Sequence, residues 1–195
     1  MRTFFIADTH FGHSNSLGFD HRPWDTIEEM DEEMIRRWNR KVSKVDHVYV
    51  LGDFAYRNKT SITNYVKRLN GTIHLIRGNH DKRTDAFERC FEEVTDYKEI
   101  VLEVNGEKRR VILCHYFIPF YHGARRRSKA IMLHGHTHKE QESEIEEKMK
   151  KMLRESGFRC EAYNVGCMWQ NYEPQTLEEI IARQERNPEE SFQDS

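Results

Sequence analysis

Short apolar runs recur along the chain, and each is followed at once by polar residues. They occupy residues 4–7, 48–51, 73–76, 111–114 and 131–133. Runs of this length, bounded by turn signals, are typical of buried strands. The pattern predicts strands at about 2–7, 47–51, 72–76, 95–104, 109–115, 131–134 and 163–166.

Between these runs, apolar residues recur at the spacing of a helix. Thr26 and Glu29 stand three residues apart at the start of such a segment, the pattern of a capping box. This segment continues to about Lys41, and Asn70-Gly71 marks the end of the next helix. Expected helices are 26–41, 61–69, 142–156 and 176–186.

The order of these elements predicts the class of fold. Early strands alternate with helices, which indicates parallel strands joined by crossovers. Asn105-Gly106 between two apolar strands is typical of a tight antiparallel hairpin. We therefore expect an α/β fold that contains both strand directions.

The length of 195 residues fits a single domain, and no linker rich in proline, glycine or serine divides it. We expect one domain over 1–184, a helical insertion at about 140–158 and a flexible tail at 185–195. The four cysteines form no C-x-x-C pair. With neither a signal peptide nor an apolar run of membrane-spanning length, reduced thiols and a cytoplasmic location are expected. The net charge of −2 does not predict nucleic-acid binding.

Residue types that bind metals follow the apolar runs. In α/β sheets the carboxyl ends of the strands border one crevice, so side chains distant in sequence meet there. Seven candidates stand at these ends: Asp8, His10, Asp53, Asn79, His115, His136 and His138. Carboxylate, imidazole and amide ligands suit Mn, Fe, Zn, Co or Ni better than Ca or Mg, and we favour Mn. Because seven ligands are too many for one ion, we expect two ions about 3.5–4 Å apart that share a carboxylate.

The motifs resemble those of the calcineurin-like metallophosphoesterases. That family pattern is matched in order by D-T-H, G-D, G-N-H-D, C-H-Y and G-H-T-H, over roughly residues 1–166. The D-T-H-F-G-H start and the N-V-G at 164–166 are similar to small bacterial and phage phosphoesterases. The resemblance implies a four-layer sandwich, in which two mixed β-sheets pack face to face with helices outside, and it implies hydrolysis of a phosphoester.

The resemblance also implies a role for each motif residue. It assigns Asp8, His10 and His138 to the first ion, Asn79, His115 and His136 to the second, and Asp53 to a bridge between them. A hydroxide bridging the ions is then the nucleophile. His80 is expected to face the phosphate without binding metal, as an acid or a stabiliser of charge. Asp81 is expected to orient the His80 imidazole, and an adjacent carboxylate raises the pKa of such a ring.

Four further residues are candidates for substrate binding: His13, Arg125, Arg126 and Arg127. His13 is either substrate-facing or a structural residue of its loop. The arginine run either grips phosphate oxygens or is a solvated surface run.

We expect a phosphodiesterase for a nucleotide or a nucleic-acid-derived substrate, with no membrane partner. A phosphomonoesterase is the alternative, followed by a metal-bound module for protein contacts without catalysis. The motifs do not distinguish among substrates, because the metals grip only the phosphate, and they leave the oligomeric state open.

Overall fold

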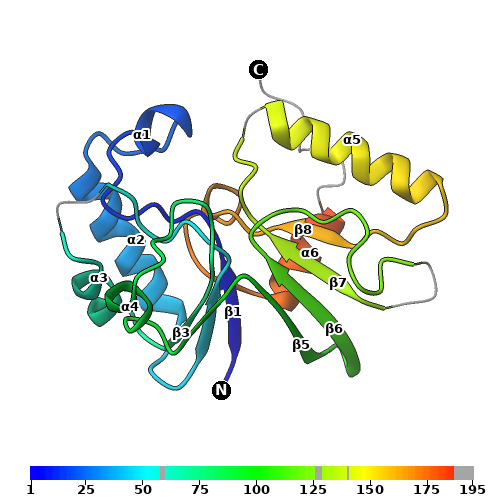
Figure 1. Ribbon diagram of the computed structural model, residues 1–195, viewed down its shortest axis with the longest axis horizontal. Coiled ribbons are helices and arrows are strands. Elements are labelled where there is room, and N and C mark those ends of the chain that lie inside the picture. Colours follow the sequence, from blue (N-terminus) through cyan, green and yellow to red (C-terminus); the bar gives the residue numbers. More distant parts are fainter. Residues whose placement is uncertain (58–59, 126–128, 140, 187–195) are drawn as a thin grey trace.

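In the computed structural model, which describes residues 1–57, 60–125, 129–139 and 141–186, the early strands form one sheet (Figure 1). Its strands lie in the order β4-β3-β2-β1-β9. The first four are parallel and β9 is antiparallel to β1. Their bounds are β1 Thr3–Ile6, β2 His47–Val50, β3 Thr72–Ile76, β4 Glu93–Thr95 and β9 Gln175–Thr176.

The later strands form a second sheet, in the order β5-β6-β7-β8. These strands are β5 (Tyr97–Val104), β6 (Glu107–Cys114), β7 (Ile131–His134) and β8 (Ala162–Asn164). β5 and β6 form the antiparallel hairpin that Asn105-Gly106 predicts, with both turn residues at positive φ. β6, β7 and β8 are parallel to one another. Each sheet therefore contains both parallel and antiparallel pairs of strands.

The two sheets pack face to face around an apolar core. Phe5, Leu51, Leu113 and Leu133 are fully buried between them. The sheets also meet at the carboxyl end of β1, where the Ala7 amide donates to the Val165 carbonyl at 2.8 Å. This junction fixes the residues that follow β1 beside those that follow β8.

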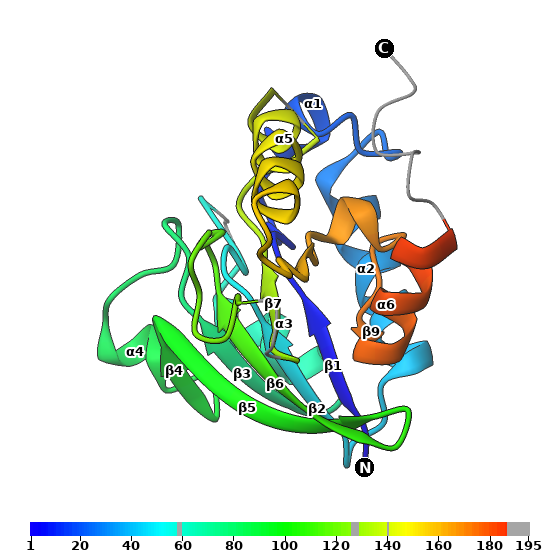
Figure 2. The ribbon, with the colours of Figure 1, turned by 90° about the vertical axis from the view of Figure 1, so that its right-hand side faces the viewer.

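Helices cover the first sheet on its outer side. Thr26 caps α2 (Ile27–Lys41) by accepting a hydrogen bond from the Glu29 amide at 3.2 Å, as the capping pattern predicts. The buried side chains of Met34 and Trp38 pack with the apolar residues of the sheet. α3 (Ile62–Arg68) belongs to the same layer, and Figure 2 shows α6 (Leu177–Arg186) beside β9. Two sheets with flanking helices confirm the predicted fold class.

The helix after the last histidine motif, α5 (Gln141–Glu155), is held by a buried carboxylate. Glu146 accepts a hydrogen bond from Thr137 Oγ1 at 2.7 Å and lies 3.1 Å from His134 Nε2. Burial raises the pKa of Glu146, but His134 and Lys150 outweigh burial and lower that pKa to about 2. Glu146 therefore connects α5 to the loop that carries His136 and His138.

The structure departs from the predicted elements in one important place. Of the predicted strand at 95–104, Thr95 belongs to β4 in the first sheet, and residues 97–104 form β5 in the second. Asp96 stands at the crossing, where its carboxylate pairs with Arg77 at 2.8 Å and Arg83 at 2.9 Å. β4 ends at Thr95 and β5 begins at Tyr97, so Asp96 is the residue between the two strands.

Shorter elements were not predicted: α1 (Ser16–Phe19), α4 (Asp85–Glu88), the 3₁₀ turn Cys167–Trp169 and β9. Each has too few residues to show a period. Most of the predicted tail lies outside the described residues. All four cysteines are free, as expected, and none of the described helices combines the length and apolar character needed to cross a membrane.

Candidate metal centre

The loops that follow β1, β2, β3, β6 and β7 converge at one edge of the two sheets, between α1 and α5 (Figure 1). In each case the apolar strand is buried, so the polar residues just after it emerge at that edge. The seven candidate ligands all come from these loops, and Asp8, His10, Asp53 and His115 are almost fully buried.

The ligand atoms fall into two groups that share Asp8. One group is Asp8, His10 and His138, and the other is Asp8, Asp53 and His115; within each, the ligand atoms lie within 4.8 Å of one another. Asp53 Oδ2 lies 3.7 Å from His10 Nε2 in the first group and 3.7 Å from His115 Nε2 in the second. Asp53 thus belongs to the second group and also adjoins His10 of the first.

The remaining two candidates lie beside the second group. Asn79 Oδ1 lies 3.1 Å from His115 Nε2. The imidazole of His136 packs edge-on against His115, with ring centroids 5.1 Å apart, and its backbone amide donates to Asp8 Oδ2 at 3.1 Å. The structure thus brings all seven predicted ligands together.

The backbone at this edge is held in an uncommon conformation. Four of the candidate ligands are non-glycine residues with positive φ: Asp8 at 54°, His10 at 49°, Asp53 at 53° and His136 at 71°. Such positions cost about 1–3 kcal/mol each and cluster at functional sites. Gly52 also has positive φ, and a Cβ there would overlap the His115 ring and the Gly78 Cα. The close approach of β2 to these loops requires glycine at this position.

The donor set fits a divalent cation. His10 Nε2 is buried and has no hydrogen-bond partner among the described residues. Burial, together with neighbouring positive groups, lowers the pKa of His10 well below its usual value, so its ring is neutral and able to act as a ligand. Burial also raises the pKa of Asp8 to about 7, although His138 opposes that effect. A bound dication would offset this cost of burying the carboxylate.

Two residues without a predicted role, Asp20 and Arg22, contact candidate ligands and hold them in place. His138 Nδ1 lies 2.6 Å from Asp20 Oδ1, which leaves His138 Nε2 free for a metal. The buried Arg22 donates to Asp20 Oδ2 at 2.7 Å and to the Asp8 carbonyl at 2.9 Å. Burial raises the pKa of Asp20, but the His138 hydrogen bond and Arg22 outweigh it and hold that pKa below its usual value. Both residues lie in the long first loop, where no periodic signal identifies them.

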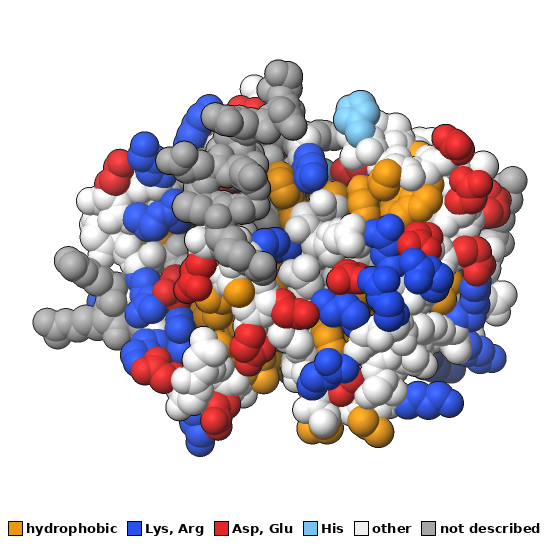
Figure 3. Space-filling model, turned by 180° about the vertical axis from the view of Figure 1, so that it is seen from behind, with side chains coloured by type: hydrophobic (Ala, Val, Ile, Leu, Met, Phe, Trp, Pro, Cys, Tyr) orange, Lys and Arg blue, Asp and Glu red, His pale blue; other side chains and the backbone are white. Residues whose placement is uncertain are grey.

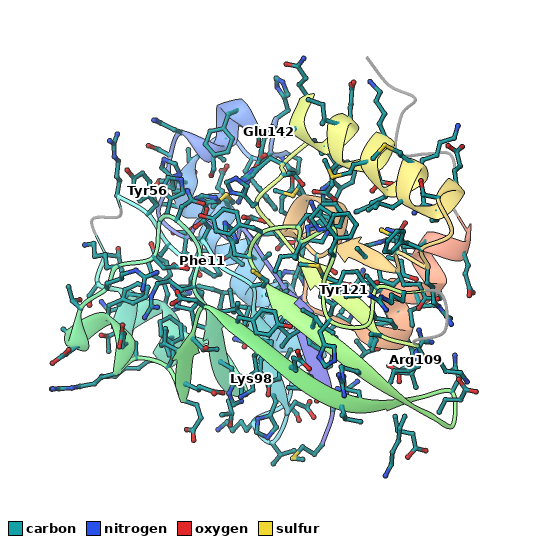
Figure 4. The ribbon with its side chains drawn as sticks, turned by 45° about the vertical axis from the view of Figure 1, so that its right-hand side comes forward. Phe11, Tyr56, Lys98, Arg109, Tyr121 and Glu142 are labelled. Carbon is teal, nitrogen blue, oxygen red and sulfur yellow. The ribbon has the colours of Figure 1, made fainter. Side chains whose placement is uncertain are left out.

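His80 lies beside the ligands. Its ring packs on Tyr56 with centroids 4.1 Å apart, and its Nε2 lies 3.9 Å from Asp53 Oδ2. The His80 side chain is 33% exposed, which leaves one side of the ring open to an incoming molecule. Figure 4 shows Tyr56 in the half of the molecule that holds the first sheet, and Glu142 at the start of α5.

The contacts of Asp81 differ from the prediction. Both of its oxygens accept backbone hydrogen bonds: Oδ2 from Asp53 at 2.9 Å and Gly78 at 2.8 Å, and Oδ1 from Phe54 at 3.1 Å. The sequence predicts instead that this carboxylate orients the His80 ring. Its role in the structure is to join the loops after β2 and β3. Burial raises the pKa of Asp81 to about 6, against the effect of these hydrogen bonds.

The predicted substrate-binding residues lie in different places. His13 is buried at the centre, with its Nδ1 3.3 Å from His10 Nδ1 and its ring packed against Tyr56. Arg125 lines a separate pocket that none of the candidate metal ligands borders. Arg126 and Arg127 lie outside the described residues.

Several known proteins are similar to this chain. A protein of Methanocaldococcus jannaschii, MJ1445, is 37% identical over 113 residues, and the match covers 57% of each chain. The chain thus spans little more than half the length of that relative. The gene 66 protein of Mycobacterium phage L5 is 27% identical over 160 residues, or 70% of this chain and 77% of that one. The protein AQ665 of Aquifex aeolicus shares the fold at a TM-score of 0.64 with 23% identity, covering 92% of this chain and 97% of that chain.

The motif residues and the matched family model cover the same part of the chain. The model of the calcineurin-like phosphoesterase superfamily domain matches residues 1–177, which include both sheets and every candidate ligand. The chain therefore belongs to the calcineurin-like phosphoesterase superfamily.

Proposed function

We propose that this protein is a metal-dependent phosphodiesterase that hydrolyses a nucleotide or a nucleic-acid-derived substrate. One observation carries the proposal: two groups of ligand atoms share Asp8, and Asp53 of the second group also lies 3.7 Å from His10 Nε2 of the first. Such an arrangement suits two divalent ions, for which Asp8, His10 and His138 form one set and Asn79, His115 and His136 form the other. Asp53 then contributes to both.

The residues around the ions divide the remaining work. When bound, paired divalent ions act as Lewis acids and lower the pKa of water so that it becomes a nucleophile at neutral pH. His80 faces the open side, where its ring can hydrogen-bond a phosphoryl or leaving oxygen. Asp81 keeps the loops after β2 and β3 at a fixed separation, which sets the position of His80 relative to Asp53.

The openness of the centre favours a diester over a monoester. Asn79 is exposed and His80 is half-buried, so a phosphate with a substituent on each side can approach them. Tyr116 is 44% exposed and packs on the His136 ring at 4.7 Å, which offers an apolar face beside the ligands.

The first prediction is the metal content. Protein purified without a chelator should contain close to two transition-metal ions per chain, because seven ligands exceed the needs of one. Elemental analysis of the active protein measures the ratio, and protein treated with chelator is the control. A stable ratio near one in fully active protein contradicts the paired site.

The second prediction is the substrate class. Mn-loaded protein should hydrolyse bis-p-nitrophenyl phosphate with a higher kcat/KM than p-nitrophenyl phosphate, and a chelator should abolish both activities. A preference for the monoester makes the protein a phosphatase instead. If the metal-loaded protein hydrolyses neither ester, nor any compound in a screen of phosphate esters, the catalytic proposal fails and a binding module takes its place.

A further inference from the structure

A pocket lies on the outer side of the second sheet, apart from the candidate metal ligands. Its volume is about 930 Å³. Among the described residues, its lining contains no acid but five basic side chains and three aromatic ones: Lys108, Arg110, His122, Arg125, Lys129, Phe120, Tyr121 and Phe158. We propose that this pocket binds a segment of single-stranded nucleic acid, with phosphates on its basic rim and a base against Phe120.

The pocket is formed before any ligand arrives. Tyr121 is buried at its base and donates a hydrogen bond to the Glu161 carbonyl at 3.1 Å. The backbone amide of Arg159 donates to the Ala124 carbonyl at 3.1 Å. Figure 4 shows Tyr121 against the second sheet, on the opposite side of the view from Tyr56. Side chains held in this way, such as that of Tyr121, need no further ordering when a ligand binds.

The charge on the rim is only partly neutralised. Arg110 and His122 share the carboxylate of Glu99, at 3.6 and 3.0 Å, and Lys129 pairs with Glu107. Lys108 and Arg125 are exposed, and no acid among the described residues pairs with either. These two cations are therefore available for an anionic ligand.

This arrangement differs from the opposite face of the molecule. In Figure 3, basic side chains on that face lie among acidic ones. Many of them pair, as Arg36 does with Glu33 and Arg40 with Glu173. A mixed surface of that kind attracts no particular sign of charge, whereas the pocket lining among the described residues carries only one sign.

An exposed aromatic ring beside the unpaired cations points to nucleic acid among anionic ligands. Phe120 is 69% exposed and lies edge-on to Phe158, with ring centroids 5.5 Å apart. A phosphate ion makes no use of such a ring, and an apolar partner makes no use of Lys108 and Arg125. Stacked bases joined by phosphates match both, as in other sites for single strands.

The pocket is connected to the metal centre by a short stretch of chain. His115 is a candidate ligand, the next residue is the exposed Tyr116, and Phe120 follows within the same loop. A nucleic-acid strand held on Phe120 and the basic rim would then pass Tyr116 to reach the metal ligands. This role as a holding site for substrate rests on the proposed function, but binding in the pocket is separable from hydrolysis.

The experiment measures binding of a fluorescein-labelled oligothymidylate by anisotropy in excess chelator, where no metal-dependent hydrolysis occurs. We compare the wild type with Lys108→Ala/Arg125→Ala and with a matched control, Lys44→Ala/Lys67→Ala, which removes two exposed charges elsewhere. The pocket variant should bind about tenfold more weakly, and the control should match the wild type. Since each phosphate contact on a single strand contributes about 0.7 to the slope of log K against log salt, losing two should reduce that slope by about 1.4.

A third variant identifies the kind of anion. Phe120→Ala should weaken oligonucleotide binding by about tenfold, leave the salt slope unchanged, and leave binding of inorganic polyphosphate unchanged. Equal affinity of the pocket and control variants, or no binding by the wild type at low salt, overturns the proposal. Oligonucleotide affinity that is insensitive to Phe120→Ala also overturns it, in favour of a site for inorganic polyanions. Turnover of bis-p-nitrophenyl phosphate by the wild type tests the proposed function separately.

Discussion

The Asp53→Asn variant should lose at least about 100-fold in kcat/KM, more than the 10–100-fold typical of losing a residue that only supports a ligand. Asparagine has the same shape, and its amide oxygen can still accept the hydrogen bond that Asp53 Oδ1 takes from the His80 amide at 2.9 Å. The fold should therefore be preserved. What is lost is a negative charge 3.7 Å from ligand atoms of both groups, His10 Nε2 and His115 Nε2.

Asp20→Asn is the matched control for this variant. Asp20 contacts His138 Nδ1 at 2.6 Å, so its replacement should weaken one ion while leaving the other in place. Elemental analysis should show both ions depleted in Asp53→Asn and at most one depleted in Asp20→Asn. If Asp53→Asn retains two ions and near-normal turnover, the bridge is formed by another residue. Asp8, which belongs to both groups, is then the next to test.

Local pattern predicts much of the fold of this chain. Buried strands such as β3 and β7 are found where continuous apolar runs predict them, and α2 begins at the predicted cap. The chain passes from the first sheet to the second at Asp96. This crossing is not predictable from the sequence, because Asp96 looks like a polar position within one continuous strand. Its ion pairs with Arg77 and Arg83 exist only once β3 and the loop after it are in place.

The candidate centre shows the same division between local and tertiary information. The candidate ligands could be named because each lies in the loop that follows a strand, and the carboxyl ends of strands meet. Asp20 and Arg22 lie in a loop whose path depends on α1 and α2, so nothing local marks them. The hydrogen bonds of Asp81 were predicted wrongly for a related reason: adjacency to His80 in sequence suggests a side-chain contact. The backbone instead directs the carboxylate toward the amides of Asp53, Phe54 and Gly78.

The His80→Ala variant should lose about 10²–10⁴-fold in kcat while it keeps both metal ions, because a positioned acid or base contributes that much. The His80 side chain is 33% exposed and its Nε2 lies 3.9 Å from Asp53 Oδ2, so it adjoins the ligands without completing either group. Its ring packs on Tyr56 rather than being enclosed by the core, so removal of the ring should leave the fold intact.

Leaving groups of different basicity separate the two roles open to His80. If the ring protonates the leaving oxygen, the loss in His80→Ala should be much smaller for p-nitrophenyl esters, whose leaving group needs no proton, than for alkyl esters. If the ring stabilises charge on the phosphoryl oxygens, the loss should be equal for both, and His80→Gln, which retains a hydrogen-bond donor, should recover part of the rate. Metal content measured on each variant is the control. A collapse of that content in His80→Ala would show that His80 is a ligand, and the division of roles between His80 and the seven surrounding residues would then be wrong.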